Sequence, residues 1–272
     1  MQILQIFCGG NPMRKWMILS LVLVILGCGK ASDQNSSASD NRSSENNANS
    51  PKSASVGSKQ MPAVVLIKCD KKYGSGFLFK DNNQLFLVTA AHLFNEEPKC
   101  EVFQFLCYRC KNTIEKTTKD SKDRGDLQIH ETRDVAVFGL ESMSVNDELK
   151  ALPVSTIEDV KMAADLQLTQ EVFVVGYPVL GKNSFPKGPL IRRGIVSAYD
   201  GNELVLDCHI LPGNSGGAVF EINQGKYKII GVVSGIISVN SEPDGPNSGY
   251  SIVEPIDSVL TLIDQYRQRK TK

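Results

Sequence analysis

Short apolar runs separated by turns follow one another along most of this chain, and they limit its fold class more than any other feature. Each run is rich in Val, Ile, Leu and Phe, and polar or glycine-bearing residues separate it from the next. Many short strands at this spacing favour an all-β sandwich or barrel over alternating strands and helices. The expected strands are residues 63–68, 75–80, 84–89, 100–108, 134–140, 171–177, 190–199, 203–208, 218–222, 227–236 and 249–253.

Residues 145–168 are the one long interval without a strand pattern, and they divide the expected strands into two groups. We therefore expect two barrels, at about residues 61–145 and 165–254. After the second barrel, a proline precedes a stretch in which apolar residues recur at helical spacing. This pattern predicts a closing amphipathic helix over about residues 255–269.

Residues 1–27 have the pattern of a secretory signal peptide. Two basic residues precede the apolar run WMILSLVLVILG at residues 16–27, which is too short for a bilayer-spanning helix of roughly 20 residues. Residues 25–30, ILGCGK, resemble the bacterial lipobox, in which a signal peptidase cuts before a cysteine that is then lipidated. The resemblance implies a lipidated Cys28, and the alternative is an ordinary signal peptide in which this cysteine has no role.

Residues 28–60 are predicted to be a disordered linker. After Cys28 they hold ten serines, five asparagines and a single larger aliphatic residue, Val56, so they cannot bury enough apolar surface to offset their conformational entropy. We expect a flexible connection between a membrane anchor and a domain in the cell envelope. In a Gram-negative cell, the absence of Asp after the lipidated cysteine implies the outer membrane.

The charge balance argues against one class of partner. The chain has 30 Lys and Arg against 30 Asp and Glu, which gives a formal net charge of zero. No basic field is available to hold a nucleic-acid backbone, so nucleic acid is not an expected partner.

The segment LPGNSGGAVF at residues 211–220 places one serine among three glycines. The glycines either only shape a tight turn, or they let two backbone N–H groups point at one spot beside Ser215, where a reacting oxygen could lie. GNSGG also matches the nucleophile elbow of α/β-hydrolases, which needs a histidine after the serine. All three histidines of this chain precede Ser215, so the elbow is excluded.

The remaining chain orders for a nucleophilic triad are His–Asp–Ser and Asp–His–Ser. The first order fits His92, where a strand gives way to small alanines, and Asp134, at the start of an apolar strand. The second would need Asp70 or Asp81, which lie in polar turns, and an α/β fold that the strand pattern opposes.

The motifs GSGF (74–77), TAAH (89–92), DVAVF (134–138) and GNSGG (213–217) stand in the order and spacing of trypsin-like, double-β-barrel serine proteases. Over about residues 61–269 the chain resembles this family, and most closely bacterial Deg-type proteases, but we expect it to have no PDZ domain. The resemblance implies two antiparallel six-stranded barrels and no metal or organic cofactor.

The same resemblance assigns roles residue by residue. Ser215 is the expected nucleophile, His92 the general base and Asp134 the acid that orients the imidazole, while the N–H groups of Gly213 and Ser215 form the oxyanion hole. His209 is expected at the base of the specificity pocket, and Ile210 and Val233 are expected to form its apolar walls. The substrate backbone is expected to pair as an added strand with Ser234 and Gly235.

Five cysteines remain after the lipobox: Cys69, Cys100, Cys107, Cys110 and Cys208. Cys107 and Cys110, with Cys100 upstream, allow three readings: zinc ligands that lack a fourth partner, a disulfide within this cluster, or reduced thiols.

The sequence thus predicts a lipid-anchored serine endopeptidase that acts on polypeptides. The alternative is a lipoprotein that keeps the same fold but cleaves nothing and serves as a binding or scaffold module.

Overall fold

The computed structural model describes residues 63–70, 72–95, 100–107, 113–140, 152, 154–181, 185–223, 226–239 and 245–271. The predicted signal peptide, Cys28 and the predicted linker lie outside these residues. Within the described parts, no helix combines the length and apolar character needed to cross a membrane.

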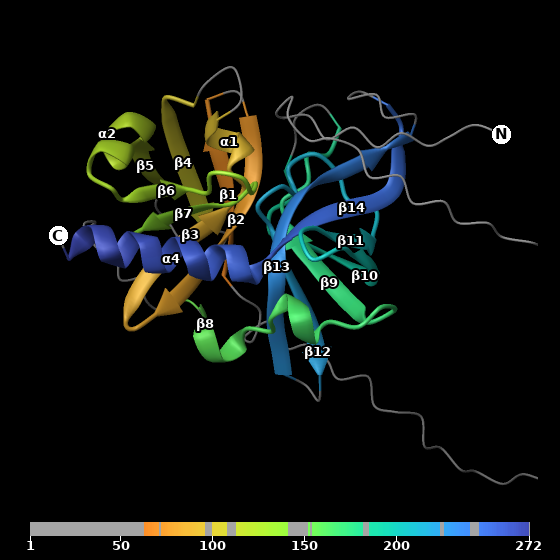
Figure 1. The fold of residues 1–272 in the computed structure, drawn as a ribbon. Helices are drawn as coiled ribbons and strands as arrows, with labels where there is room; N and C mark the ends of the chain where they lie inside the picture. Colours follow the sequence, from red (N-terminus) through yellow and green to blue (C-terminus); the bar gives the residue numbers. More distant parts are fainter. Residues whose placement is uncertain are drawn as a thin grey trace, which may run out of the picture. The chain divides into compact units, whose positions relative to one another are not determined.

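The first half of the described chain forms one sheet (Figure 1). The strands follow the order β5-β4-β1-β2-β3-β7-β6, neighbours pair in the antiparallel sense, and β8 adds to β2 in the parallel sense. The strands are β1 (Val64–Cys69), β2 (Lys72–Asp81), β3 (Gln84–Thr89), β4 (Val102–Cys107), β5 (Thr113–Thr117), β6 (Leu127–Ile129), β7 (Ala136–Gly139) and β8 (Ser155–Thr156).

The two edge strands of this sheet, β5 and β6, are not neighbours in its hydrogen-bonded path, whereas a closed six-stranded barrel was expected. The short helix α2 (Thr118–Asp123) connects them and contacts both. Because β6 is only three residues long and a helix covers the gap, the edges need no direct pairing.

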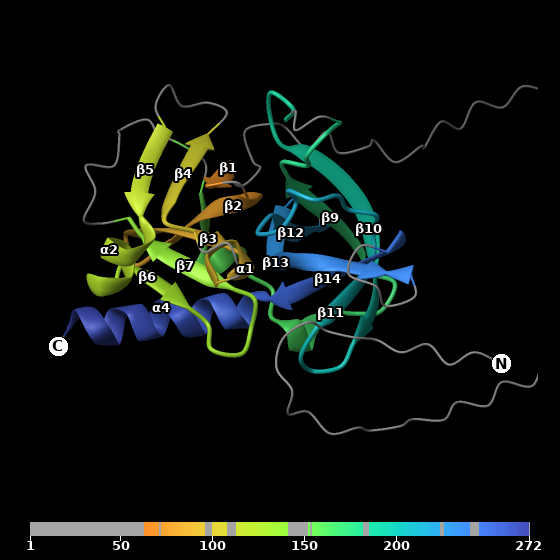
Figure 2. The ribbon, with the colours of Figure 1, turned by 90° about the horizontal axis from the view of Figure 1, so that it is seen from above.

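The second half is a closed antiparallel barrel of six strands, in the order β10-β11-β14-β13-β12-β9 (Figure 2). Its closure and the all-β architecture confirm the predicted fold class. The strands are β9 (Glu171–Gly176), β10 (Leu190–Tyr199), β11 (Leu204–Asp207), β12 (Ala218–Asn223), β13 (Lys226–Ser238) and β14 (Asn247–Pro255). Two 3₁₀ turns, η1 (Ile157–Asp159) and η2 (Ala163–Asp165), precede it.

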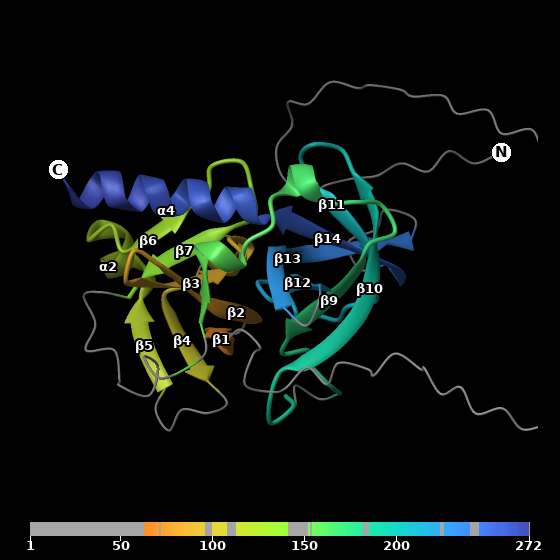
Figure 3. The ribbon, with the colours of Figure 1, turned by 90° about the horizontal axis from the view of Figure 1, so that it is seen from below.

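The helix α4 (Ile256–Lys270) leaves the end of β14 and runs back along β6 and β7 of the first sheet (Figure 3). Its buried face contributes Val259, Leu262, Ile263 and Tyr266 to a core that also contains side chains of both halves. Tyr266 packs edge-on against Phe86 of β3. A single apolar core therefore joins the first sheet, the second barrel and α4.

A disulfide joins Cys69, the last residue of β1, to Cys100, which precedes β4. Cys100 is therefore not available as a zinc ligand or for pairing with Cys107 or Cys110. Cys110 and the side chain of Cys107 lie outside the described part of the structure. Cys208 is a buried free thiol, and burial raises the pKa of that thiol.

Candidate active site

His92 and Asp134 are held together by two hydrogen bonds. Nδ1 of His92 lies 2.7 Å from Oδ2 of Asp134, and the main-chain N–H of His92 donates to Oδ1 at 2.7 Å. With both carboxylate oxygens engaged, the imidazole has one orientation relative to the acid. Nε2 is left as the ring nitrogen that can exchange a proton with a third group.

The sheet places the two residues at the same end of neighbouring strands. His92 opens the short helix α1 (His92–Asn95) three residues after β3 ends, and Asp134 lies two residues before β7 begins. β3 and β7 pair antiparallel with Thr89 opposite Ala136, so the end of one meets the start of the other. Residues that are 42 positions apart in sequence thus come into contact.

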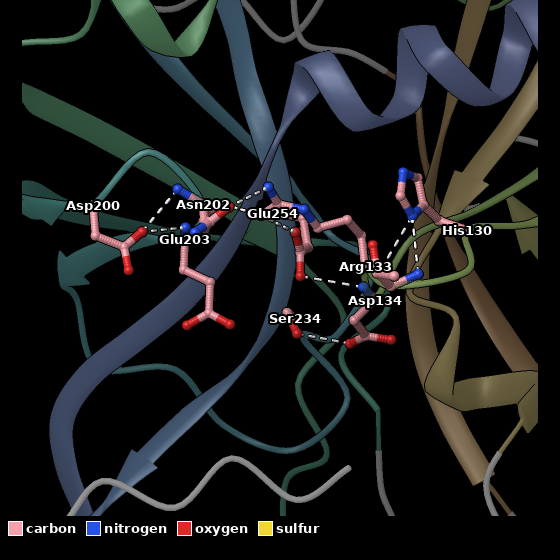
Figure 4. A network of polar contacts seen from close by, with 9 residues as sticks. His130, Arg133, Asp134, Asp200, Asn202, Glu203, Ser234 and Glu254 are labelled. Atoms are coloured by element: carbon pink, nitrogen blue, oxygen red, sulfur yellow. Dashed lines mark hydrogen bonds and ion pairs between the residues drawn. The ribbon is translucent and has the colours of Figure 1, made fainter. Parts of the chain in front are cut away.

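Ser234 of β13 also binds the carboxylate of Asp134: its hydroxyl donates to Oδ2 at 2.7 Å (Figure 4). A register shift in the pairing of β13 with β14 passes over Ser234, between Val233 and Gly235. Such a bulge redirects a side chain out of the regular strand alternation. The sequence had suggested only a substrate-pairing role for Ser234, because the bulge leaves no signal in the residue pattern.

Ser215 is held against the first sheet by its main chain. Its carbonyl oxygen accepts the N–H of Ser75 in β2 at 2.7 Å. A β-carbon on the next residue, Gly216, would lie 2.2 Å from Oγ1 of Thr89 and 2.9 Å from the N atom of Ala90, which lies two residues before His92. The nucleophile candidate therefore lies beside the strand end that carries His92, although it belongs to the second half.

The glycines of the serine loop have backbone angles that other residues rarely adopt. Gly213 has φ +91° and Gly216 has φ +83°. In this loop the N–H groups of Asn214, Gly216 and Gly217 donate to the carbonyl oxygens of Leu211, Val233 and Asn214.

The N–H groups of Gly213 and Ser215, by contrast, have no acceptor among the described residues. Two unpaired donors beside one serine are compatible with an oxyanion hole, in which both N–H groups point at one oxygen.

The residues predicted for the specificity pocket separate into two groups. Ile210 and Val233 are buried, and the carbonyl oxygen of Ile210 accepts a hydrogen bond from the Asn247 side chain at 2.7 Å. His209 is exposed at the end of β11, and a β-carbon on Gly235 would meet no atom within 4 Å. Space beside Gly235 is compatible with a strand added along β13.

Within the described residues, no group of three or more His, Cys, Asp or Glu side chains is arranged to hold a metal ion. The chemistry available at this site is that of a serine, an imidazole, a carboxylate and backbone donors.

The sequence profile of the trypsin-like peptidase domain family matches residues 74–232, a span that includes His92, Asp134 and Ser215. A chloroplast protein of Arabidopsis thaliana, "Protease Do-like 1", is 28% identical over 198 residues, which is 71% of this chain and 38% of that protein. The chain therefore spans well under half the length of this relative.

Two solved structures share the fold. A serine endoprotease from Yersinia pestis aligns with a TM-score of 0.52 at 20% identity, over 80% of this chain and 67% of that chain. The HtrA-type protease AlgW, solved with a tripeptide, aligns with a TM-score of 0.54 at 20% identity, over 77% of this chain and 61% of that chain. Because this profile matches more than half of the chain, the chain belongs to the trypsin-like peptidase domain family.

Proposed function

We propose that this chain is a serine endopeptidase in which Ser215 is the nucleophile, His92 the general base and Asp134 the orienting acid. The paired hydrogen bonds between His92 and Asp134, at 2.7 Å each, are the observation that carries the proposal. The contact of the Ser215 main chain with Ser75 supports it, because this contact brings the nucleophile to the same end of the first sheet.

The reaction follows from these positions. The Ser215 hydroxyl adds to the carbonyl carbon of a peptide bond while Nε2 of His92 removes its proton. The N–H groups of Gly213 and Ser215 stabilise the negative charge that develops on the carbonyl oxygen. His92 then gives the proton to the leaving amine, and a water molecule hydrolyses the acyl ester by the same steps in reverse order.

For the substrate, we propose polypeptides with a small or medium apolar residue before the cut. The support is His209, which by the resemblance stands where trypsin-type enzymes carry the aspartate that selects Lys and Arg, next to a part of the barrel whose Ile210 and Val233 side chains are apolar and buried. A library of peptides tests this: cleavage after Lys or Arg would overturn it. Preference for an acidic or amide side chain would assign recognition to His209 instead.

We also propose that Cys28 carries a lipid and holds the domain at a bacterial membrane, in the outer membrane of a Gram-negative cell. The support is the sequence ILGCGK and the serine-rich segment that follows. Metabolic labelling with a palmitate analogue tests it. Wild-type protein should carry the label and sediment with membranes, and Cys28→Ser protein should do neither.

A fluorophosphonate probe tests the enzyme activity directly, because it reacts only with an activated serine. We expect labelling of the wild type and of Ser197→Ala, a control on β10, but none of Ser215→Ala. If folded wild-type protein takes up no probe and cleaves no peptide, the peptidase proposal is wrong. A binding or scaffold lipoprotein then becomes the better description.

A further inference from the structure

Asp134 belongs to the first half of the fold, where it binds His92, but the second half also holds it in place. Its main-chain N–H donates to Oε1 of Glu254 in β14 at 3.2 Å, and its carboxylate accepts the hydroxyl of Ser234 in β13 (Figure 4). Two strands of the barrel that carries Ser215 therefore hold the residue that orients His92.

The residue before it, Arg133, reaches the same barrel at two places. Its Nη1 lies 3.5 Å from Oε2 of Glu254, and its Nη2 donates to the side-chain oxygen of Asn202 at 3.0 Å. Nη1 also donates to the carbonyl oxygen of Asn202. Asn202 lies in the turn between β10 and β11, so one guanidinium group spans β14 and this turn.

Local hydrogen bonds hold both the turn at Asn202 and the main chain of Arg133. The carboxylate of Asp200 accepts the N–H groups of Asn202 and Glu203, at 2.8 and 2.9 Å, which shapes the turn. On the other side, Nδ1 of His130 accepts the N–H of Arg133 at 3.2 Å. Local hydrogen bonds thus hold the turn that Arg133 binds and also the main chain of Arg133 itself.

The burial of the Glu254 carboxyl group is energetically unfavourable. It is 4% exposed, and its Oε2 atom accepts no hydrogen bond among the described residues. The pKa of this carboxyl is raised, chiefly by burial and further by the neighbouring carboxylates of Asp134 and Glu203, while the Asp134 N–H and Arg133 act in the opposite direction. Because its surroundings disfavour the charged form, Glu254 is not expected to be in this position for the stability of the fold.

We propose that Glu254 and Arg133 are positioning residues that hold Asp134 in register with the barrel carrying Ser215. This rests on the proposed peptidase function. We call Arg133, Glu254 and Asn202 the clasp. It acts on turnover through the geometry of Asp134 and His92, and a displacement of about 1 Å at such a site can lower the rate on the order of 100-fold.

The central variant is Glu254→Gln, which keeps an oxygen for the Asp134 N–H but removes the charge that attracts Arg133. We expect kcat to fall at least about 10-fold while KM changes less than about twofold, because substrate contacts are untouched. Arg133→Gln should give a similar loss, and the double variant should lose little more, since the two residues act as one unit. Glu171→Gln and Arg193→Gln are the matched controls, because these residues form an exposed ion pair on the same barrel.

A second readout does not depend on turnover. The proton between Nδ1 of His92 and Asp134 gives a downfield NMR resonance, which can be followed in Ser215→Ala protein. Adding Glu254→Gln should broaden or shift this resonance, and adding Glu171→Gln should leave it unchanged.

The outcomes separate the two proposals. If the wild type is active but both clasp variants keep its kcat and the resonance, the clasp proposal is overturned and the peptidase proposal stands. If the wild type is inactive, the peptidase proposal fails, and the resonance alone decides whether the clasp positions Asp134. If Glu254→Gln does not fold, Arg133→Gln provides the same test.

Discussion

The hydroxyl of Ser75 in β2 donates a hydrogen bond to the carbonyl oxygen of Gly213 at 2.7 Å, and so joins the first sheet to the serine loop of the second barrel. The hydroxyl oxygen of Ser75 in turn accepts the N–H of Tyr177 at 2.7 Å. All three groups are buried. One side chain therefore binds two backbone groups and holds the Gly213–Asn214 peptide, which lies between the two N–H groups proposed for the oxyanion hole.

Replacing Ser75 by alanine should remove the two hydrogen bonds that its hydroxyl makes with the Gly213 carbonyl and the Tyr177 N–H. We expect a loss of about 1–3 kcal/mol of unfolding free energy, since each hydrogen bond contributes about 0.5–1.5 kcal/mol net. Turnover should fall as well, because the Gly213 peptide is freed to rotate. Urea unfolding and peptide hydrolysis check this against Ser197→Ala, and unchanged values for both would remove Ser75 from this role.

Gly216→Ala adds only one methyl group, but it should strongly destabilise the folded protein. A β-carbon there would lie 2.1 Å from the carbonyl oxygen of Ser75, and the residue has φ +83°. The clash is with main chain, which cannot move aside without separating the two halves. Thermal unfolding should show a large loss for this variant and almost none for Gly235→Ala, where a β-carbon meets open space.

Substitutions at the proposed triad should abolish hydrolysis and spare the fold. Ser215→Ala and His92→Ala should each remove most activity, and Asp134→Asn should lower kcat on the order of 10⁴-fold because the imidazole loses its orienting acceptor. Ser234→Ala removes one hydrogen bond to the carboxylate and should cost roughly 10- to 100-fold. A loss below tenfold for Asp134→Asn would show that another acid orients the histidine.

The raised pKa of Glu254 predicts how stability depends on pH. The folded state binds a proton at this carboxyl more readily than the unfolded state, whose pKa lies near 4.5. Stability contributed by this group is therefore lost as the pH rises from about 4.5 through the higher folded pKa. Glu254→Gln should remove this loss.

Chemical unfolding of both proteins from pH 4 to 8 measures the effect. The variant should gain stability relative to the wild type as the pH rises, while remaining the slower enzyme. A variant that is less stable at every pH and equally fast would show that Glu254 serves the fold alone.

Asn214→Asp should destabilise the serine loop. Asn214 is 2% exposed, and its Nδ2 atom has no hydrogen-bond partner among the described residues. A carboxylate there would be a buried charge without a partner, which costs about 3–5 kcal/mol. The expected result is a lower melting temperature that recovers at acid pH, where the carboxyl is protonated; an unchanged melting temperature at neutral pH would contradict it.

The strand pattern was enough to predict the all-β class and a division into two groups of strands. The resemblance to trypsin-like proteases, carried by short motifs in a fixed order, implied the six-stranded barrels and the pairing of His92 with Asp134. The clasp was not predictable, because Asp134 and Glu254 are 120 residues apart and no pattern links them.

Two further details depended on tertiary geometry. The carboxylate contact of Ser234 arises from a bulge, and a bulge changes which way a side chain points without changing composition. Cys69 pairs with Cys100 because the end of β1 lies beside the start of β4. The sequence spacing had instead indicated a disulfide among Cys100, Cys107 and Cys110.

The return of α4 over the first sheet affects how the protein is made. Ribosomes release a chain from its N-terminus, so β1 to β7 emerge well before Ile263 and Tyr266, which complete their core. The first half therefore waits, with part of its apolar surface uncovered, until the last helix arrives. We therefore expect the two halves to complete their folding together once α4 has been made, and a chain interrupted before α4 to expose apolar surface of the first sheet.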